Sequence, residues 1–478
     1  MTKKLFSPLI WIQSSKLFWF SYGIMGCIWI SYAFITYVLC GHTEDISLQT
    51  HPVVNAAVHG QYWNTMFDGH PFSNHFRPGL LVFYPFIKLF PMVPYTLWPI
   101  VAKSISFMVA PLLLLKLGRK ALPDQRWIFA IPLLWLLSDV LMRPMTTPNY
   151  ASSLLFAPIV GAFYFAYVGR LKWVYVLVFA MTLFKENMPL IGVCLAMFLI
   201  VEKQQWRQGL ALGLFSIVLG LSALTIMNQF GFPVTQGHGV SGLSVFYRFD
   251  WKLTMVTKLI IGAGLIPFIA PKTLLYQLPA TAVYWLMYTD EKKFFFTNGH
   301  HHDYTMTIMM VCALFALRHS LSGESWFLKK TSRVRTVLAS LLVVGIGVSG
   351  ITNLPKLLIM NTSTNEPYSI QERYHTYTQM RQIKKQIPRS ATVTATPYTT
   401  GFFLGQKQIH SVLYMQLESV QFTDDFIVVP LTAKAAGLSR EYHTKLEQVI
   451  QKKIQRGKLK KHAYSTDRIA VYRPSSDL

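Results

Sequence analysis

Residues 40–78 form the first long polar stretch of the chain and read CGHTEDISLQTHPVVNAAVHGQYWNTMFDGHPFSNHFRP. Five of the chain's 14 histidines lie in this stretch, at positions 42, 51, 59, 70 and 75. It also holds Glu44, Asp45 and Asp68 and a single basic residue, Arg77, and apolar runs lie on both sides. A polar, aromatic stretch rich in His and Asp between apolar runs predicts a reaction site at a membrane surface.

The composition places the chain among membrane proteins. Hydrophobic residues make up 52% of it and charged residues only 14%, and the mean hydropathy is +0.34. Apolar runs near 20 residues recur, which is the length needed to cross about 30 Å of hydrocarbon. The first run, about residues 17–39, is too long for a signal peptide and lacks a small-residue cleavage site, so we expect it to be retained. The sequence predicts an α-helical multi-pass membrane protein.

The net charge of +24 fits the same class. Lys and Arg collect on the cytoplasmic side of membrane proteins and against anionic head groups. No basic face with stacking aromatic residues is recognisable, so we expect no nucleic-acid partner. The cysteines, at positions 27, 40, 194 and 312, lie in or beside apolar runs, which excludes a disulfide framework from the polar C-terminal region.

The alternation of apolar runs and basic clusters predicts about 11 spans. Lys3, Lys4 and Lys16 precede the first span and place the N-terminus in the cytoplasm, so that residues 40–78 form an outer loop. Residues 79–90 are too few to cross and are predicted to form an interfacial helix on the outer side. The predicted spans are 17–39, 95–115, 127–142, 151–168, 173–185, 188–201, 209–228, 255–270, 273–289, 305–317 and 336–353.

We therefore expect a transmembrane domain over residues 1–353 and a small extracytoplasmic α/β domain over residues 354–478. The second region predicts helices at 366–387 and 440–455, strands at 391–396 and 425–431, and a hairpin at 463–473. Its basic character predicts contact with an anionic membrane lipid or wall polymer, or simply a solvated basic surface, and both readings stay open.

Three polar residues of the outer loop are candidates for chemistry. Asp45 lies about six residues beyond the first span, where a carboxylate near the head groups could deprotonate an acceptor hydroxyl. The alternative is an ordinary loop Asp or a helix cap. His75 and Arg77 close the loop with donors suited to a phosphate, the alternative for Arg77 being a side chain that snorkels to the interface.

Three further candidates lie at or inside predicted spans. Lys103 lies within the second span, where an ionisable residue is a functional candidate because an unpaired charge in lipid is costly. It could neutralise a polyprenyl phosphate or pair with another buried carboxylate, with Asp139 near the outer end of the third span as the candidate partner. Lys185 and Glu186 interrupt the apolar stretch 173–201 and present a charged pair at the outer surface, or simply form the turn of a helical hairpin.

The last candidates, His302 and Tyr304, lie in the stretch HHHDY at 300–304. Three consecutive histidines do not share one helical face and no matching ligand set is evident, so we expect hydrogen bonding to a sugar or phosphate there. No metal site or cofactor is predicted, although a divalent metal stays open. No P-loop, GxSxG or nucleotide-binding fingerprint is present, which favours an activated lipid over a soluble nucleotide as donor.

At these residues the chain resembles the bacterial multi-pass proteins grouped as "domain of unknown function 2079", which are similar to GT-C glycosyltransferases. The resemblance runs from about residue 40 to 473. The chain departs from the family pattern in four places: Thr50 stands where it has a second Asp, Arg77 where it has Ser and Asn187 where it has Asp, and Asp303 is an extra residue within its His-Tyr element. The matching elements are Asp45, Asn55, Gly60, Asp68-Gly69, His75-Phe76-Arg77-Pro78, Lys185-Glu186-Asn187, His302-Asp303-Tyr304 and the stretch IPRSATV at 387–393.

The resemblance implies a GT-C-like architecture, a polyprenyl-phosphate-linked sugar as donor, inversion at the sugar carbon and an acidic base in the first outer loop, here Asp45. The leading hypothesis is therefore a glycosyltransferase of the bacterial cell membrane that acts on a cell-envelope acceptor at the outer face. The alternatives are a transporter or flippase of lipid-linked solutes and a non-catalytic envelope scaffold. A transporter predicts polar residues at mid-membrane on several helices, whereas here they gather at helix ends.

Overall fold

The structure is a computed structural model in which the described part of the chain is mostly helical, with 15 α-helices and a small C-terminal sheet. The residues that it describes are 15–38, 44–66, 68–138, 141, 151–231, 242–288, 302–323, 337–338, 340–341, 370–414, 417 and 424–475. These divide into two compact units, one comprising Met1–Ile30, Phe72–Gly79 and Ala102–Leu358, the other Ser31–Pro71, Leu80–Val101 and Ile359–Leu478.

Helices occur at the predicted spans that the structure describes, but many are short. Only α5, α11 and α14 are, within the described residues, both long and apolar enough to cross a membrane. The prediction of about 11 spans is therefore not supported, and most of the run 336–353 lies outside the described residues. The helices in this part of the chain are α2 (Ser15–Val38), α5 (Leu97–Ala121), α6 (Ala130–Leu137), α8 (Phe156–Tyr167), α9 (Leu171–Thr182), α10 (Pro189–Val201), α11 (Trp206–Gln229), α12 (Phe249–Gly262), α13 (Leu278–Leu286) and α14 (Asp303–Ser322).

The predicted spans and the observed helices differ because an apolar run in the sequence does not reveal a break in the helical backbone. The run 255–270 is α12 followed by a left-handed turn at Gly264 and Leu265, with φ of +69° and +59°, and then a 3₁₀ segment, η7 (Ile266–Ile269). The other short segments here are η4 (Gln125–Trp127), η5 (Ser153–Leu155), η8 (Pro271–Tyr276) and the paired strands β1 (Gly242–Leu243) and β2 (Met287–Tyr288). Hydropathy counts the side chains, while the turn depends on backbone angles.

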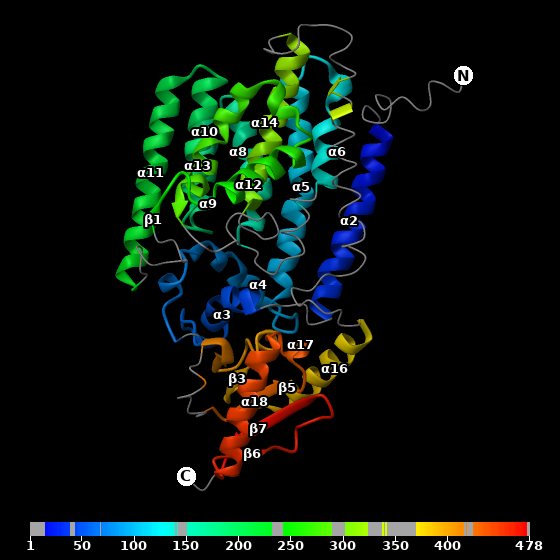
Figure 1. The fold of residues 1–478 in the computed structure, drawn as a ribbon, viewed down its shortest axis with the longest axis vertical. Helices are drawn as coiled ribbons and strands as arrows, with labels where there is room; N and C mark the ends of the chain where they lie inside the picture. Colours follow the sequence, from blue (N-terminus) through cyan, green and yellow to red (C-terminus); the bar gives the residue numbers. More distant parts are fainter. Residues whose placement is uncertain are drawn as a thin grey trace, which may run out of the picture. The chain divides into compact units, whose positions relative to one another are not determined.

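Burial separates a central helix from a peripheral one in the first unit. In α14, 83% of the most apolar window is buried, whereas in α11, at the edge of this unit in Figure 1, the share is 22%. The exposed side of α11 carries Leu210, Leu214, Ile217, Val218 and Leu221. A long helix that exposes a row of aliphatic side chains is suited to face lipid, while α14 packs against protein on all sides.

Small residues bring α10 and α11 close together. A Cβ atom added at Gly192 would lie 1.9 Å from the Ser216 hydroxyl oxygen, and one added at Gly209 would lie 2.5 Å from Ile200 Cγ1. Close backbone approach through small residues is a common way for membrane helices to pack, because lipid supplies no hydrophobic force between them. At the far end of α10, the Glu202 carboxylate binds His319 at 2.9 Å and also pairs with Arg318, which joins α10 to the end of α14.

The second unit contains the α/β fold predicted for the C-terminal region. Its strands are β3 (Thr392–Ala395), β4 (Gln408–Ser411), β5 (Phe426–Pro430), β6 (Leu459–Lys461) and β7 (Ile469–Pro474), in the order β4-β3-β5-β7-β6. Both β4 and β5 run parallel to β3, whereas β7 is antiparallel to β5 and to β6. The predicted terminal hairpin is present, but its first strand lies at 459–461, and β4 was not predicted.

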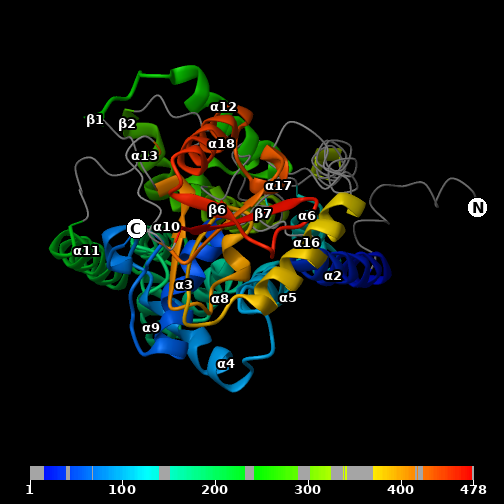
Figure 2. The same cartoon turned by 90° about the horizontal axis from the view of Figure 1, so that it is seen from below.

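Helices cover both faces of this sheet (Figure 2). The helices are α16 (Ile370–Gln386) on one face, and α17 (Ala433–Ala436) and α18 (Arg440–Gln455) on the other. Leu446 and Ile450 of α18 pack with Ile427 and Val429 of β5 in the buried core. The Ser439 hydroxyl accepts a hydrogen bond from the Tyr442 amide at 3.1 Å and caps α18, whose bounds match the prediction.

The same unit includes most of the polar stretch that opened the sequence. Its main element is a helix, α3 (Glu44–His59), where we expected a loop, and α4 (Tyr84–Leu89) follows after η2 (Pro71–Ser73) and η3 (Pro78–Phe83). The remaining 3₁₀ segments are η11 (Thr400–Phe402) and η12 (Val412–Tyr414). The His59 ring lies 3.1 Å from the Gln406 carbonyl oxygen, so α3 is tied to the segment that leads into β4. The short helix predicted at 79–90 is present as η3 and α4, and its interfacial location stays a prediction.

Candidate functional site

A close backbone contact in the first unit brings two predicted site segments together. The Gly79 amide donates to the Leu183 carbonyl oxygen at 2.7 Å, and a Cβ atom added at Gly79 would lie 2.8 Å from Phe184 Cδ2. Only a residue without a side chain fits at this contact. Residues 75–79 are thereby held against the turn that connects α9 to α10, which contains Lys185 and Glu186.

Both carboxylate oxygens of Glu186 bind the segment that contains His75. His75 Nδ1 lies 2.9 Å from Glu186 Oε1, and the Phe76 amide donates to Oε2 at 3.3 Å. Only 17% of the His75 side chain and 13% of the Glu186 side chain are exposed. With Nδ1–H donated to a carboxylate, a neutral His75 ring carries its lone pair on Nε2, where it can accept a hydrogen bond or a proton.

Two buried cations surround this pair and set its protonation. Arg77 and Lys185 are 8% and 6% exposed. Burial and then the charge of Arg77 lower the pKa of His75 to about 4, despite the attraction of Glu186. Burial alone would raise the pKa of Glu186, but the combined attraction of His75, Lys185 and Arg77 outweighs it and holds that pKa below its ordinary value. At neutral pH the site therefore contains an ionised Glu186 and a neutral His75.

A second carboxylate, Asp303, lies in electrostatic reach of Lys185. Its Oδ2 accepts hydrogen bonds from the Ser152 and Ser153 hydroxyls at 2.8 and 2.9 Å, and it also attracts Lys103 of α5. Asp303 is fully buried at the first turn of α14, and Lys103 is 5% exposed. Lys185 thus connects the His75–Glu186 pair to the Lys103–Asp303 pair.

His302 and Tyr304 flank Asp303 and contact a different neighbour. The Tyr304 hydroxyl donates to the Tyr284 hydroxyl at 2.9 Å, and the His302 ring lies 4.7 Å from the Tyr284 ring, centroid to centroid. Both side chains are buried, and they position the start of α14 against α13. His300 and His301 lie outside the described residues. Within the described part of the chain, no three His, Cys, Asp or Glu side chains gather in a way that could hold a metal ion.

The structure therefore brings five of the eight predicted residues into one linked cluster: His75, Arg77, Lys103, Lys185 and Glu186. His302 and Tyr304 lie one residue on either side of its second carboxylate. Asp45 lies in the first turn of α3, in the other compact unit, and its side chain is outside the described part. Asp303, Ser152 and Ser153 were not predicted as site residues. The only signal for Asp303 was its place in the family-like stretch, because its burial depends on how α14 packs.

The chemistry of this cluster follows from its charges. Three basic side chains, Arg77, Lys103 and Lys185, gather around two carboxylates in a buried part of an apolar helical unit. Arg and Lys bind phosphate oxygens through charge-assisted hydrogen bonds, which are roughly twice as strong as neutral ones. The arrangement is suited to an anion such as a phosphate, with His75 able to donate or accept a proton.

Comparisons with known proteins give the chain its family. No curated protein matches the sequence. A family described as "Predicted membrane protein (DUF2079)" matches residues 45–297, which include α3, the His75–Glu186 pair, Lys103 and the Ser152–Ser153 pair. This match spans more than half of the 478 residues. The chain thus belongs to the DUF2079 family of predicted membrane proteins.

Proposed function

We propose that this protein is a glycosyltransferase of the bacterial cell membrane that transfers a sugar from a polyprenyl-phosphate donor to a cell-envelope acceptor. The observation that carries the proposal is the buried cluster of Arg77, Lys185 and Lys103 around Glu186 and Asp303. Removing so many charged groups from water is costly, so such a cluster within apolar helices is a functional candidate by default.

The proposed donor matches both the positive charges of this cluster and the apolar surface of the helices around it. A polyprenyl phosphate joins an anionic group to a long apolar chain. The basic residues would bind the anion, while exposed aliphatic rows such as that of α11 show that this unit is suited to lipid. A soluble nucleotide donor would need a phosphate-binding loop that the sequence lacks.

The proposed reaction is a displacement at the sugar carbon. The acceptor hydroxyl oxygen attacks the anomeric carbon, the bond from that carbon to the phosphate oxygen breaks, and the polyprenyl phosphate leaves with the electron pair. A base takes the hydroxyl proton, and from the family-like position we propose Asp45 for this role. His75, Arg77, Lys103 and Lys185 would bind the phosphate, Glu186 would orient His75, and the sugar carbon would invert. His302 and Tyr304 would support the start of α14 beside Asp303.

The proposed orientation puts the N-terminus in the cytoplasm and the C-terminal α/β domain outside the membrane. A transporter or flippase and a non-catalytic scaffold are the competing functions. The first described residue of α14 is the buried Asp303, and Lys185 and Glu186 follow the end of α9, so these polar groups lie at helix ends. This placement favours chemistry near a surface over a pathway through mid-membrane.

Lipid binding gives the first test. Full-length protein in nanodiscs would be loaded with polyprenyl phosphate or with polyprenol of the same chain length, and retained lipid measured by native mass spectrometry. We expect the phosphate to be retained in preference to the alcohol, and Lys185→Gln to weaken its retention about tenfold through loss of a charge-assisted hydrogen bond. Lys185→Arg should keep most of the binding. Lys172→Gln, an exposed lysine at the opposite end of α9, is the matched control. Equal retention of phosphate and alcohol would contradict the proposal.

Transfer itself is tested in cells. Mass spectrometry of envelope glycans would compare the wild-type strain, a deletion strain and a strain that carries Asp45→Asn. We expect a sugar to be lost in the deletion strain and in the Asp45→Asn strain. An unchanged glycan in the deletion strain would rule out the transferase. A wild-type glycan in the Asp45→Asn strain would remove only the role of Asp45 as base.

A further inference from the structure

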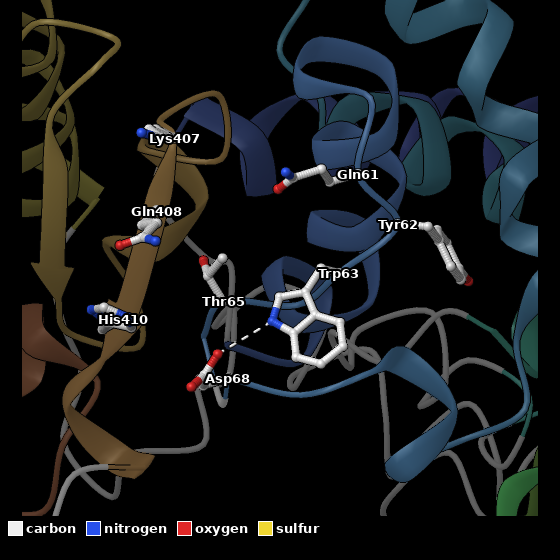
Figure 3. Close-up of a pocket in the computed structure, with 8 residues that line it drawn as sticks. All are labelled: Gln61, Tyr62, Trp63, Thr65, Asp68, Lys407, Gln408 and His410. Atoms are coloured by element: carbon white, nitrogen blue, oxygen red, sulfur yellow. Dashed lines mark hydrogen bonds between the residues drawn. The ribbon is translucent and has the colours of Figure 1, made fainter. Parts of the chain in front are cut away.

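The compact unit that contains the C-terminal sheet has a pocket of about 470 Å³, and none of the residues assigned above lines it. Figure 3 shows its lining residues. Small-ligand sites commonly have volumes of about 300–1,000 Å³. One wall is the segment that follows α3, and the other is the edge strand β4. The lining residues are Gln61, Tyr62, Trp63, Thr65, Asp68, Lys407, Gln408 and His410.

Hydrogen bonds fix the two walls to each other. The Thr65 hydroxyl donates to the Ile409 carbonyl oxygen and accepts from the Ile409 amide, both at 2.8 Å. The buried His51 ring lies 2.8 Å from the same hydroxyl. Because the hydroxyl proton already goes to Ile409, His51 Nε2–H donates to the hydroxyl. Burial lowers the pKa of His51 to about 4, so the ring is neutral at neutral pH. These hydrogen bonds join the two walls of the pocket directly.

A tight turn presents Asp68 to the pocket. Asn64 and Gly69 exchange backbone hydrogen bonds of 3.1 and 3.0 Å, and Asp68 between them has a left-handed φ of +48°. The Trp63 indole N–H donates to Asp68 Oδ1 at 3.3 Å, which places the aromatic ring and the carboxylate side by side (Figure 3). Trp63 is 39% exposed, so part of its side chain is accessible to a ligand.

The opposite wall supplies polar groups from alternate positions of β4. Ile409 is buried in the unit, so Gln408 and His410, one residue to either side, share the other face of the strand. His410 Nδ1 lies 2.8 Å from the buried Asp424 carboxylate, which orients the ring. The hydrogen bond to Asp424 raises the pKa of His410 against the opposing effect of burial, and the charge of Asp68 adds to this. With Nδ1 bound to Asp424, Nε2 is the ring nitrogen available to a ligand in the pocket.

We propose that this pocket binds a saccharide, stacked on Trp63 and hydrogen-bonded through Asp68, Gln408 and His410. A sugar ring has apolar C–H faces and a rim of hydroxyls that both donate and accept. The exposed face of Trp63 can pack against the C–H faces of the sugar. The carboxylate, amide and imidazole of Asp68, Gln408 and His410 can hydrogen-bond its hydroxyls. The proposal rests on the proposed function to the extent that the saccharide is the acceptor of the transferred sugar.

The charges of the lining favour this ligand over the alternatives. A phosphate would find a cation at Lys407 but would also meet the Asp68 carboxylate next to Trp63, and a lipid chain would meet polar groups on both walls. A polyhydroxyl ligand is compatible with an acid and a base facing the same space, because each hydroxyl can serve either as donor or as acceptor. The ligand is therefore a polyhydroxyl compound and not a phosphate or a lipid.

Direct binding tests the inference. Full-length protein in detergent would be titrated by isothermal calorimetry with three soluble tetrasaccharides: maltotetraose (neutral), chitotetraose (N-acetylated) and tetragalacturonic acid (acidic). We expect at least one to bind, and Trp63→Ala to weaken it about tenfold. Asp68→Asn should weaken it similarly while keeping the turn, because Asn tolerates a left-handed backbone. Tyr374→Ala removes an exposed aromatic residue of the same unit that does not line the pocket, and it should bind like the wild type.

The outcomes separate this inference from the proposed function. Failure of all three sugars to bind, or wild-type binding by both pocket variants, would overturn the saccharide site. If a sugar still binds while polyprenyl phosphate is not retained and the deletion strain keeps its glycan, the proposed function fails and the saccharide site stands. If the lipid and glycan tests succeed without saccharide binding, only this inference fails.

Discussion

Replacing Glu186 by Gln isolates the role of one buried charge. The substitution keeps the size of the side chain and one acceptor oxygen, so the main loss is the negative charge. That charge faces Arg77 and Lys185, and its two oxygens bind His75 and the Phe76 amide. Without it, two largely buried cations remain together with one carboxylate fewer.

The expected cost follows from this arrangement. Removing one partner of a buried ion pair costs about 3–5 kcal/mol, because the remaining charge is left uncompensated. The Glu186 side chain is only 13% exposed, so water can screen little of that loss. Proteins are stable by about 5–15 kcal/mol in total, so the variant should still fold. At about 2 °C per kcal/mol for a large domain, the melting temperature should fall by about 6–10 °C.

Differential scanning fluorimetry at one scan rate, in one detergent, measures this shift. Glu447→Gln is the control, since Glu447 is 48% exposed and lies 3.7 Å from His443, and its shift should stay within about 1 °C. In the Glu186→Gln background, Lys185→Gln should cost less than it does alone, because it removes a cation that has lost one of its two neighbouring carboxylates. The electrostatic reasoning would be refuted if the decreases in melting temperature of the two substitutions were additive. It would also be refuted if the decrease for Glu186→Gln were no larger than that of the control.

Three further outcomes are expected. Burial lowers the pKa of His51 to about 4 from an ordinary value of about 6.5. The contribution of the neutral His51 ring to the free energy of unfolding is therefore complete above pH 6.5 and is lost as the pH falls toward 4. By pH 5 the free energy of unfolding has decreased by about 2 kcal/mol. The melting temperature of His51→Gln should accordingly fall less than that of the wild type between pH 8 and pH 5, and equal slopes would contradict this. Thr65→Val removes the hydroxyl that binds β4 and should speed amide hydrogen exchange in residues 408–411. Unchanged exchange rates there would contradict this role of Thr65. Gly192→Ala should destabilise the α10–α11 contact by about 1–3 kcal/mol, since a new Cβ would lie 1.9 Å from the Ser216 hydroxyl oxygen and 2.9 Å from Val178 Cγ1. Ser216→Gly removes the closer of these two clashes and should restore part of the melting temperature; failure of the rescue would show that the contact with Ser216 is not limiting.

Local signals predicted some elements closely. The Ser439 cap and the left-handed Gly457 bracket α18, so its bounds match the amphipathic pattern. The β-branched runs predicted β3 and β5, and apolar length predicted α5 and α11. Lys185 and Glu186 stood out because two charged residues interrupt an apolar stretch. Each of these signals lies within a few residues of the element that it predicts.

Other features had no local signal. The helix α3 contains Pro52 and many polar residues, and it depends on burying Ile46, Val53 and Val54 within its compact unit. The short strand β4 has no long β-branched run and exists as the edge of the sheet, paired with β3. The pocket between the segment after α3 and strand β4 was not predicted either, because its walls come from segments that are more than 300 residues apart in sequence.

The sequence by itself determined that the chain is a helical membrane protein with a C-terminal α/β region, and it resembled the correct family. It also selected His75, Arg77, Lys103, Lys185 and Glu186 as separate candidates. Only the tertiary structure decided that His75 and Glu186, 111 positions apart, form a pair, and that Asp303 is the second carboxylate of the cluster. Hydropathy and secondary-structure propensity are properties of neighbouring residues. The partner of a buried charge is instead determined by packing between distant segments, because that packing supplies the opposite charge that offsets the cost of removing the first from water.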